Sequence, residues 1–416
     1  MASQPAREKL ISVFVPEGFS NFECGMCGQC CVEPGRIVIS RAKYEKLARV
    51  LRSSNFPYPV PDALMCDESA ADEPVAFALV GDRCVFLDGE SRCRLCSLDV
   101  PEMRGIWCVS FPVSPVITPR GVNYSISFAC PKTAKMLSRR KPLRILALSV
   151  PGPAVPALDR AFPTDHLIPT RPDRPDMDWT AYQLIEGMLL AVAQDEELSA
   201  SHRMLVMHIM LGDLLGDYQG PESDEALRER VSNAAQRLPE MAEQAKSAPE
   251  NPVRHYEAIA SLFGRRVGLR SRTRLNRVVE QAMRVLRGRR TKTTADELGH
   301  TLAEIYRKHY RPKARTLDHT IANYVICRIF ANREILDGGV YKGLFWVYYL
   351  VALVKFFAAT TAAEKNKSVD EEGLRQAIQT VEKCFVQSRT AFDFLDSHDE
   401  KERMLSLEYA AALVKT

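Results

Sequence analysis

The feature that most constrains this chain is the crowding of its cysteines toward one end. Four of them fall in the segment FECGMCGQCCVEPGR, residues 22–36, and ten of the twelve in the sequence lie between Cys24 and Cys130. Free thiols at this density would be exposed to oxidation without benefit to the fold. In a reducing compartment such clustering indicates a metal site, whereas disulfides are typical of secreted proteins. The first third of the chain is therefore predicted to fold around thiolate ligands.

Composition and length indicate a globular protein of more than one domain. With 416 residues, 46% of them hydrophobic, the chain can bury a substantial core in two or three domains. The segment MASQPAREKLISVFVPEGF contains no apolar run as long as a secretory signal, so a cytoplasmic protein is expected. The net charge of +4 argues against wholesale binding of nucleic acid.

The most apolar stretch, GLFWVYYLVALVKFFAATTAA at residues 343–363, is predicted to be a buried core helix. Lys355, Thr360 and Thr361 leave it short of the roughly 20 apolar residues that a membrane span requires. Association with a membrane is therefore not expected.

A proline-rich segment, residues 151–178, separates two regions of different character. It is predicted to be a linker or an extended wrapping segment. Residues 1–150 mix strand-like and helix-like patterns, and residues 179–416 show helical periodicity almost throughout. The predicted fold class is α+β, with a small, loop-rich, metal-binding cysteine-cluster domain followed by a larger all-α helical bundle domain.

Local signals place several elements in the first region. RIVIS, residues 36–40, resembles a short strand, and Ser40 can cap a helix through RAKYEKLARVL. The segment FALVGDRCVFLDGESRC predicts strands about a turn at Asp88 and Gly89.

In the second region, YQLIEGMLLAVAQ and HRMLVMHIMLGDLLGDY have apolar residues three or four apart, as amphipathic helices do. Two capping boxes predict helix starts, one formed by Thr294 with Glu297 and one by Ser368 with Glu371.

Other residues of the second region are interpreted as structural. Cys327 and Cys384 have apolar neighbours typical of buried thiols. His202 and His208 lie six residues apart on one predicted helix, a spacing that does not bring both to one metal.

The spacing of the first cysteines favours an iron–sulfur site over a zinc site. Thiolates from a C-x2-C-x2-C run and a remote cysteine hold iron–sulfur clusters, whereas structural zinc takes paired C-x2-C knuckles or mixed cysteine and histidine sets. No histidine precedes His166, and Pro131 follows Cys130 as it follows the remote ferredoxin ligand. Gly25 and Gly28 are expected to ease the tight turn. Zinc remains the alternative.

The order of the cysteine segments resembles that of a known family. CGMCGQCC and RIVISRAKYEKL, then CVFLDGESRCRLC, WCVSFPV and SISFACPKTAKML, are similar to the cysteine-cluster family that includes flagellin lysine N-methylase. After the linker, LDHTIANYVICRIF and VYKGLFWVYYLVALVKFFAATTAA resemble the helical C-terminal part of that family. The resemblance implies an enzyme that binds S-adenosylmethionine beside a 4Fe–4S cluster and methylates lysine side chains on a protein, typically flagellin.

The resemblance also implies which thiols hold the cluster. The ligands come from a set of eight, Cys24, Cys27, Cys30, Cys31, Cys84, Cys93, Cys108 and Cys130. Cys66 and Cys96 fall outside the main spacing and are interpreted as packing or incidental thiols.

The methyl donor needs a pocket of an uncommon kind. The sequence contains neither the G-x-G loop of nucleotide-binding sheets nor the C-x3-C-x2-C run of radical enzymes. The donor is therefore expected in a pocket of the cluster region, of the helical domain or between them. Trp107, beside Cys108, and Asn323 and Tyr324, in the best-matching helix, are predicted to line it.

Other functions compete with this one. A zinc- or iron-binding cysteine-cluster protein could act without catalysis, as an interaction or redox module. The arginine-rich residues 264–290 are interpreted as a solvated helix face, with an acidic protein face as the alternative partner. Nucleic acid is not expected there, because stacking aromatic residues are missing. The sequence has no G-x-S-x-G, H-E-x-x-H or Walker motif, which argues against hydrolases and nucleoside triphosphatases.

Overall fold

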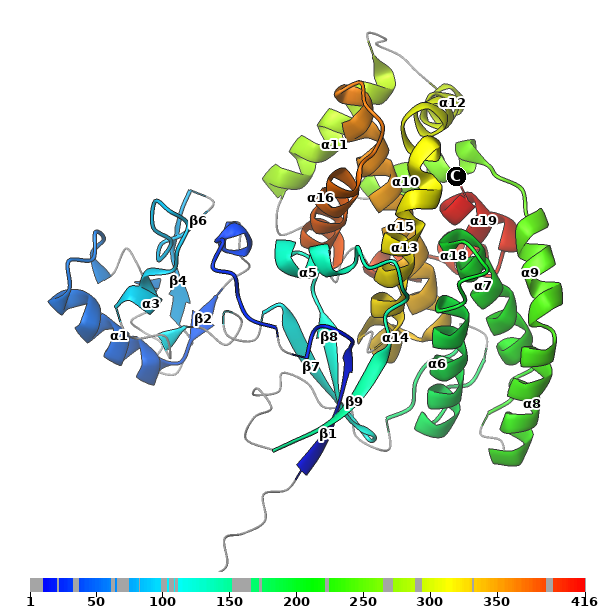
Figure 1. Ribbon diagram of the computed structural model, residues 1–416, viewed down its shortest axis with the longest axis horizontal. Coiled ribbons are helices and arrows are strands. Elements are labelled where there is room, and N and C mark those ends of the chain that lie inside the picture. Colours follow the sequence, from blue (N-terminus) through cyan, green and yellow to red (C-terminus); the bar gives the residue numbers. More distant parts are fainter. Residues whose placement is uncertain are drawn as a thin grey trace, which may run out of the picture.

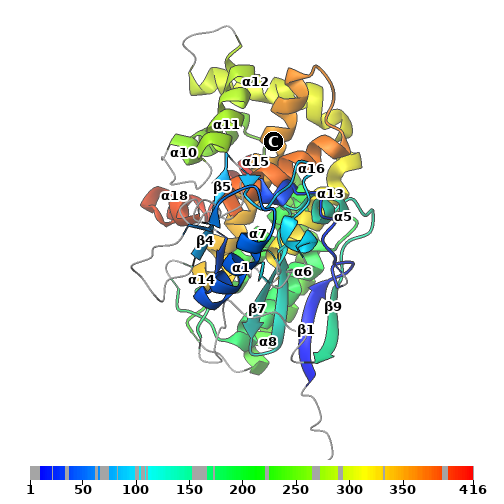
Figure 2. The same ribbon diagram turned by 90° about the vertical axis from the view of Figure 1, so that its left-hand side faces the viewer.

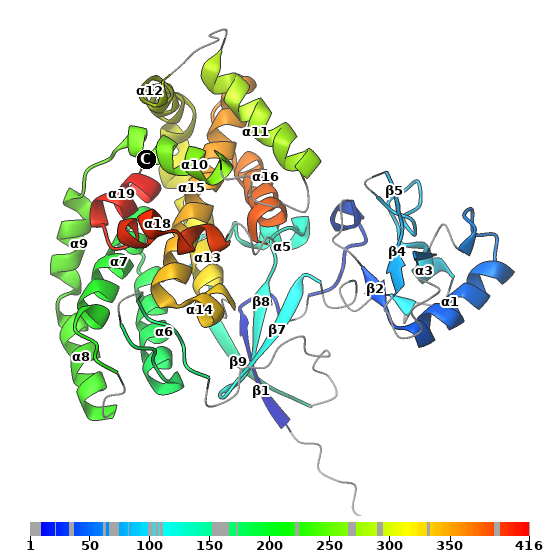
Figure 3. The same cartoon turned by 180° about the vertical axis from the view of Figure 1, so that it is seen from behind.

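The computed structural model shows a small α+β part, a sheet and a large helical part (Figure 1). It describes residues 10–20, 22–32, 37–60, 64–65, 75–81, 83–98, 103–104, 108, 111–151, 166–171, 174–220, 224–264, 272–288, 294–330, 333–386 and 392–415. The small part lies on one side of the sheet and the helices on the other, as the view from behind also shows (Figure 3). The predicted helical C-terminal region is confirmed, while metal binding by the first region stays a prediction.

The small part has short strands and a core of its own. Its described elements are β2 (Val38–Ile39), α1 (Arg41–Ser53), β3 (Leu64–Met65), β4 (Val75–Phe77), β5 (Leu79–Val80), β6 (Arg83–Cys84) and α3 (Arg94–Ser97). Strand β4 pairs with β2 and β3, and β5 pairs with β6, all in antiparallel fashion. Leu47 and Leu51 of α1 pack with Phe77 and Phe86 to form the core.

Two local predictions for the small part are confirmed. The strand predicted at RIVIS contains β2, and the Ser40 side chain accepts the N–H of Lys43 at the start of α1. This cap satisfies one of the N–H groups that a helix start leaves without a partner.

The predicted turn at Asp88 forms, but the strands around it are only partly as expected. Asp88 accepts N–H bonds from Glu90 and Arg92, and within the described residues a single Leu87–Cys93 bridge flanks the turn. The prediction that this turn joins the strands is wrong, because β5 and β6 pair about Gly81 instead. A left-handed backbone of φ +61°, which glycine adopts readily, permits that tighter reversal.

The main sheet joins distant parts of the chain. Its described strands are β1 (Leu10–Pro16), β7 (Val113–Thr118), β8 (Gly121–Ile126) and β9 (Ile145–Pro151), in the order β7-β8-β1-β9. Strand β1 is parallel to β8 and antiparallel to β9. Val15, Val116 and Phe128 belong to the same hydrophobic core as the helices. The sheet is therefore joined to the helical part, and the small part has a separate core.

The helical part contains most of the described chain. Its α-helices are α5 (Pro131–Met136), α6 (Trp179–Ala193), α7 (Ala200–Gly216), α8 (Asp224–Gln236), α9 (Leu238–Ser247), α10 (Pro252–Gly264), α11 (Arg272–Arg287), α12 (Ala295–Ile305), α13 (Arg311–Ile329), α14 (Arg333–Gly338), α15 (Val340–Glu364), α16 (Glu371–Val381), α18 (His398–Arg403) and α19 (Leu407–Lys415). A π-helical turn, Tyr306–Tyr310, joins α12 to α13, and another, Glu382–Val386, extends α16. A 3-10 turn, Asp393–Asp396, precedes α18.

The described part of the proline-rich segment wraps along the helices. Ile168 pairs with Met177, and both side chains are fully buried. The carbonyl of Pro169 then accepts the N–H of Val340, the first residue of α15, at 2.9 Å. The segment therefore contributes to the helical core at this end.

The periodic segments and one capping box are confirmed. YQLIEGMLLAVAQ falls almost entirely within α6, and most of HRMLVMHIMLGDLLGDY lies within α7. At the start of α12, the Thr294 hydroxyl accepts the N–H of Glu297 (3.2 Å), whose carboxylate accepts the N–H of Thr294 (3.0 Å).

The second capping box, Ser368 with Glu371, is wrong. Helix α16 begins at Glu371, and the residue directly before it, Asp370, is the cap. The Asp370 carboxylate accepts the N–H of Gly373 at 2.7 Å. An ionised acceptor makes a stronger bond than the serine hydroxyl would, so the helix starts at the later position.

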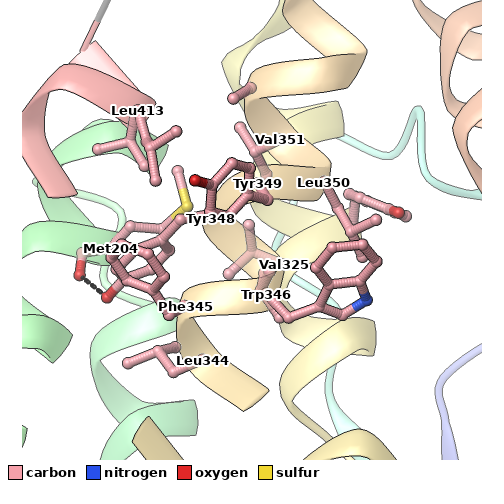
Figure 4. Close-up of a cluster of buried hydrophobic side chains, with 14 of the residues drawn as sticks. Met204, Val325, Leu344, Phe345, Trp346, Tyr348, Tyr349, Leu350, Val351 and Leu413 are labelled. Carbon is pink, nitrogen blue, oxygen red and sulfur yellow. Dashed lines mark hydrogen bonds between the residues drawn. The ribbon is translucent and has the colours of Figure 1, made fainter. Parts of the chain in front are cut away.

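Helix α15 is the core helix that the sequence predicts (Figure 4). Within the described residues it is long and apolar enough to cross a membrane, yet its apolar window is entirely buried inside the protein. Met204 of α7, Val325 of α13 and Leu413 of α19 pack in this cluster, and the Tyr348 hydroxyl donates to the Met204 carbonyl.

Lys355 is the charged residue in the middle of this buried helix. Its residue exposure is 6%, and its ammonium donates to the Ser201 hydroxyl (3.2 Å) and to the Val414 carbonyl. Burial lowers the pKa of Lys355 to about 8, although the carboxylate of Asp318 opposes this shift. The ammonium is thus held by hydrogen bonds in a position that disfavours its charge.

The contribution of this buried ammonium to the stability of the protein should rise with pH. The folded-state pKa, about 8, lies below the usual value of 10.5, so the unfolded state binds more protons between these values. The contribution of Lys355 to the free energy of unfolding therefore increases by about 3 kcal/mol across this range and not below it. Urea unfolding of the wild type and of Lys355→Met below pH 8 and near pH 10.5 should show that the wild type gains about 3 kcal/mol relative to the variant over this range. An equal increment in both proteins would contradict the burial of the charge.

Candidate functional site

The cysteine loop, residues 22–31, is the dark blue segment that runs from the sheet to the small part (Figure 1). Figure 2 shows the small part in front, with the helices behind it. Two lysines from beyond the loop hold its backbone. Lys132 of α5 donates to the Glu23 carbonyl (2.7 Å), and Lys383 of the second π-helical turn donates to the Gln29 carbonyl (2.9 Å). The loop is therefore tied to the helical part at two points.

Gly28 brings the loop against the turn that follows Leu87. Its φ of +67° is left-handed, and a Cβ there would lie 2.4 Å from the Ser91 carbonyl oxygen. A Cβ on Gly25 would meet nothing closer than a Lys132 side-chain carbon at 4.0 Å. Both glycines are expected to ease the loop, but only Gly28 is required for the close approach of the loop to Ser91.

Four described thiols gather around the core of the small part. Cys84 is buried within this core, and Cys31, Cys93 and Cys108 pack against it. The Val32–Arg83 bridge sets the end of the loop beside β6, which carries Cys84. Segments far apart in the sequence thus bring their thiols to the same small core.

The other predicted ligands are more dispersed. Cys24 and Cys27 are exposed, and the Cys24 sulfur accepts the N–H of Met26 at 3.4 Å. Cys130 is buried and precedes the first residue of α5. Cys96, predicted to be incidental, is exposed. Cys66 and the side chain of Cys30 lie outside the described residues.

Burial disfavours the thiolate form of two cysteines of the small core. Burial raises the pKa of Cys84 to about 11, and the nearby Cys93 adds to the shift. Burial also raises the pKa of Cys93, and Cys96 adds to that shift. A metal cation reverses this balance, because it displaces the proton and neutralises the thiolate. The donor chemistry therefore suits a thiolate-bound metal or cluster.

The sulfurs of the described cysteines do not form a closed ligand shell. Across the described ranges, no three His, Cys, Asp or Glu side chains lie close enough together to hold a metal ion. The loop and β6 meet, as the contact at Gly28 and the Val32–Arg83 bridge show. The set of eight ligands and the identity of the metal stay predictions.

Asn323, predicted to line the cofactor pocket, fastens a connection between α5 and β9. Its amide oxygen accepts the N–H of Leu143 (2.9 Å), and its amide nitrogen donates to the carbonyls of Leu137 (3.0 Å) and Arg139 (2.9 Å). Since the side chain is buried, these bonds satisfy an amide that would otherwise be costly to desolvate. Trp107, the second predicted pocket residue, lies outside the described residues.

Tyr324, the third predicted pocket residue, points into a buried network around Glu382. The Tyr324 hydroxyl donates to the Glu382 carboxylate (2.9 Å), whose other oxygen accepts the N–H of Phe128 (2.9 Å). The Arg328 guanidinium lies 3.5 Å from the same carboxylate and donates to the Ile126 carbonyl. This network fastens the end of β8 to α13 and to the second π-helical turn.

Sequence reasoning missed Glu382 and Arg328. Both are almost fully buried, with exposures of 0% and 6%. No local motif marks them, because they lie 54 positions apart on different helices and meet only in the fold. The sequence signal that could have found them is a charged residue at a helix position whose periodic neighbours are apolar, which indicates a buried charge.

The helical part identifies the family. The profile of the FliB lysine N-methylase C-terminal domain matches residues 187–413, more than half of the chain. The chain therefore belongs to the FliB lysine N-methylase family, as its resemblance to flagellin lysine N-methylase predicts. Neither a curated protein nor a solved structure matches the chain.

Gly28→Ala should loosen the cysteine loop. The new Cβ must displace the Ser91 carbonyl, and the left-handed backbone costs an alanine about 1–2 kcal/mol. Limited proteolysis should therefore cut the loop faster, and iron uptake on reconstitution should fall. Gly25→Ala is the matched control and should behave as the wild type. Equal cleavage rates for the two variants would show that the contact is not important.

Glu382→Gln should strongly destabilise the protein. The substitution keeps the shape of the side chain but leaves the buried Arg328 without its counter-charge, at an expected cost of about 3 kcal/mol. Denaturant unfolding measures this change. Glu372→Gln, on the exposed face of α16 where Glu372 pairs with Arg375, should cost less than about 1 kcal/mol. Similar losses in both variants would argue against the network.

Proposed function

We propose that the chain is an S-adenosylmethionine-dependent protein lysine N-methyltransferase that carries a 4Fe–4S cluster. Membership of the FliB lysine N-methylase family is the observation that carries the proposal. Flagellin or another surface protein is the proposed substrate, and the cytoplasm is the proposed location, since a reducing compartment keeps thiols available as metal ligands.

The proposed cluster ligands come from the cysteine loop and the segments that meet it. The donors are among Cys24, Cys27, Cys30, Cys31, Cys84, Cys93, Cys108 and Cys130. Contact of the loop with the Ser91 turn and the gathering of Cys31, Cys84, Cys93 and Cys108 around one core support this assignment. When bound, a cluster would supply a charged, redox-active centre to this part of the protein.

The protein must first deprotonate the lysine of its substrate. A lysine ammonium, with a pKa of ~10.4, has no lone pair, so burial or a nearby base must remove its proton. The free amine then attacks the sulfonium methyl in line. A nitrogen–carbon bond forms while the carbon–sulfur bond breaks, and S-adenosylhomocysteine leaves. Alignment of the reacting atoms at ~3 to 3.5 Å supplies much of the rate.

Anaerobic reconstitution tests the cluster and the reaction on one preparation. The protein should take up iron and sulfide, become brown, and transfer a labelled methyl group to lysine on its cognate protein. Cys27→Ser should lose both iron and activity. Cys96→Ser, which changes another exposed thiol outside the predicted set, should keep both.

Three results would contradict the proposal. Colourless protein with stoichiometric zinc would rule out the cluster. Absence of donor binding by calorimetry would favour a binding module without catalysis. A reversible redox couple without methylation would favour an electron-transfer protein.

A further inference from the structure

A cavity of about 620 Å³ lies within the helical part, away from the cysteine loop. It is formed by the start of α7, the first π-helical turn, α13, Lys355 of α15 and the end of α19, together with Arg140 and Pro142 before β9. Its volume falls within the range of small-molecule sites, roughly 300–1,000 Å³. The elements that form it belong largely to the matched C-terminal domain.

One charged group in the wall of this cavity is the Lys355 ammonium. Lys355 and its hydrogen-bond partner Ser201 both line the cavity. The ammonium also lies 5.9 Å from the centre of the Tyr310 ring, which lines the same space. A cation with a lowered pKa and little solvent around it attracts an anionic ligand group more strongly than a surface lysine does.

A negative charge fixed at the start of α7 comes from Asp318 of α13, and Glu196, Glu197 and Glu250 also line the cavity. Both carboxylate oxygens of Asp318 accept the N–H of Ala200 at 3.0 Å, which fixes the side chain at the start of α7. Burial raises the pKa of Asp318, while Ala200 and the cations of Arg203 and Lys355 oppose this shift. The cavity therefore presents an acid and a base from two neighbouring helices.

Further cations lie where the cavity meets solvent. Arg140 and Arg315 are exposed, and neither forms an ion pair with a described residue. Asn323 also lines the cavity, and its three bonds to the segment 137–143 fix the backbone on both sides of Arg140. Asn323 is thus a positioning residue for the rim.

We propose that this cavity binds a small molecule with an amino-acid head group, its carboxylate facing Lys355 and its ammonium facing Asp318. A zwitterionic head group pairs with the Lys355 ammonium and the Asp318 carboxylate at once, whereas a simple anion is repelled by Asp318 and a simple cation by Lys355. The volume leaves room for a larger group behind the head. The occupant is the methyl donor, an assignment that rests on the proposed function; a free amino acid shares the same chemistry.

Calorimetric titration of the full chain tests this site without requiring activity. S-adenosylhomocysteine carries the head group, methylthioadenosine carries the nucleoside without it, and methionine carries the head group without the nucleoside. Lys355→Met and Asp318→Asn should each weaken S-adenosylhomocysteine binding by at least about tenfold and leave methylthioadenosine binding unchanged. Lys342→Met is the matched control, because Lys342 is on the same helix but pairs with Asp396 away from the cavity.

The outcomes separate this inference from the proposed function. Unchanged affinity of Lys355→Met and Asp318→Asn for every ligand would overturn the site, even if the wild type methylates lysine. An equal loss of methylthioadenosine affinity in these two variants would also overturn it, since it would show general damage to the cavity rather than loss of contacts with the head group. Binding of methionine but not of S-adenosylhomocysteine, with the same dependence on Lys355, would support the site and reject the methyl donor as its occupant.

Discussion

The attachment of the Cys130 segment and of the cysteine loop to the helices centres on one buried carboxylate, that of Glu382. It accepts the backbone N–H of Phe128, two residues before Cys130, and it neutralises the Arg328 guanidinium beneath the sheet. The next residue, Lys383, donates to the carbonyl of Gln29 in the cysteine loop. A buried charge of this kind is tolerated only when its partners are all present, so the sheet and the helices are held in one relative position. The helical domain therefore acts as the frame to which the cysteine loop and the Cys130 segment are attached, whereas Cys84, Cys93 and Cys108 lie on the core of the small part.

The sequence predicts the helices well because their signals are local. The periodicity of α6 and α7, the capping box at Thr294 and the apolar run of α15 all depend on residues within a few turns of one another. The cap at Ser368 fails because two acceptors compete within three residues and the ionised one, Asp370, prevails. Strand β1 is beyond such reasoning, since its partners β8 and β9 lie more than a hundred residues away and short apolar runs do not specify a partner.

The candidate site could be predicted in its chemistry but not in its geometry. Thiol spacing and the absence of early histidines indicate a thiolate site, and the loop does meet the segment of Cys84 and Cys93. Spacing does not reveal that Gly28, rather than Gly25, is pressed against another backbone, because that contact joins residues 63 positions apart. The different roles of the neighbours Asn323 and Tyr324 follow from the geometry of the helix. Adjacent residues on a helix point about 100° apart, so one lines the cavity and the other reaches the buried acid.

In the two π-helical turns of the described helices, the number of residues matters as much as the identity of their side chains. Each accommodates one residue more than an α-helical turn, and such insertions often mark functional positions. One, Tyr306–Tyr310, presents both of its terminal tyrosines to the cavity, and the other, Glu382–Val386, presents an acid to the sheet and a lysine to the loop. Deleting a single residue from either turn would rotate every later side chain on that helix by about 100°. Relatives that keep these anchors are therefore expected to tolerate substitutions around them more readily than a change of register.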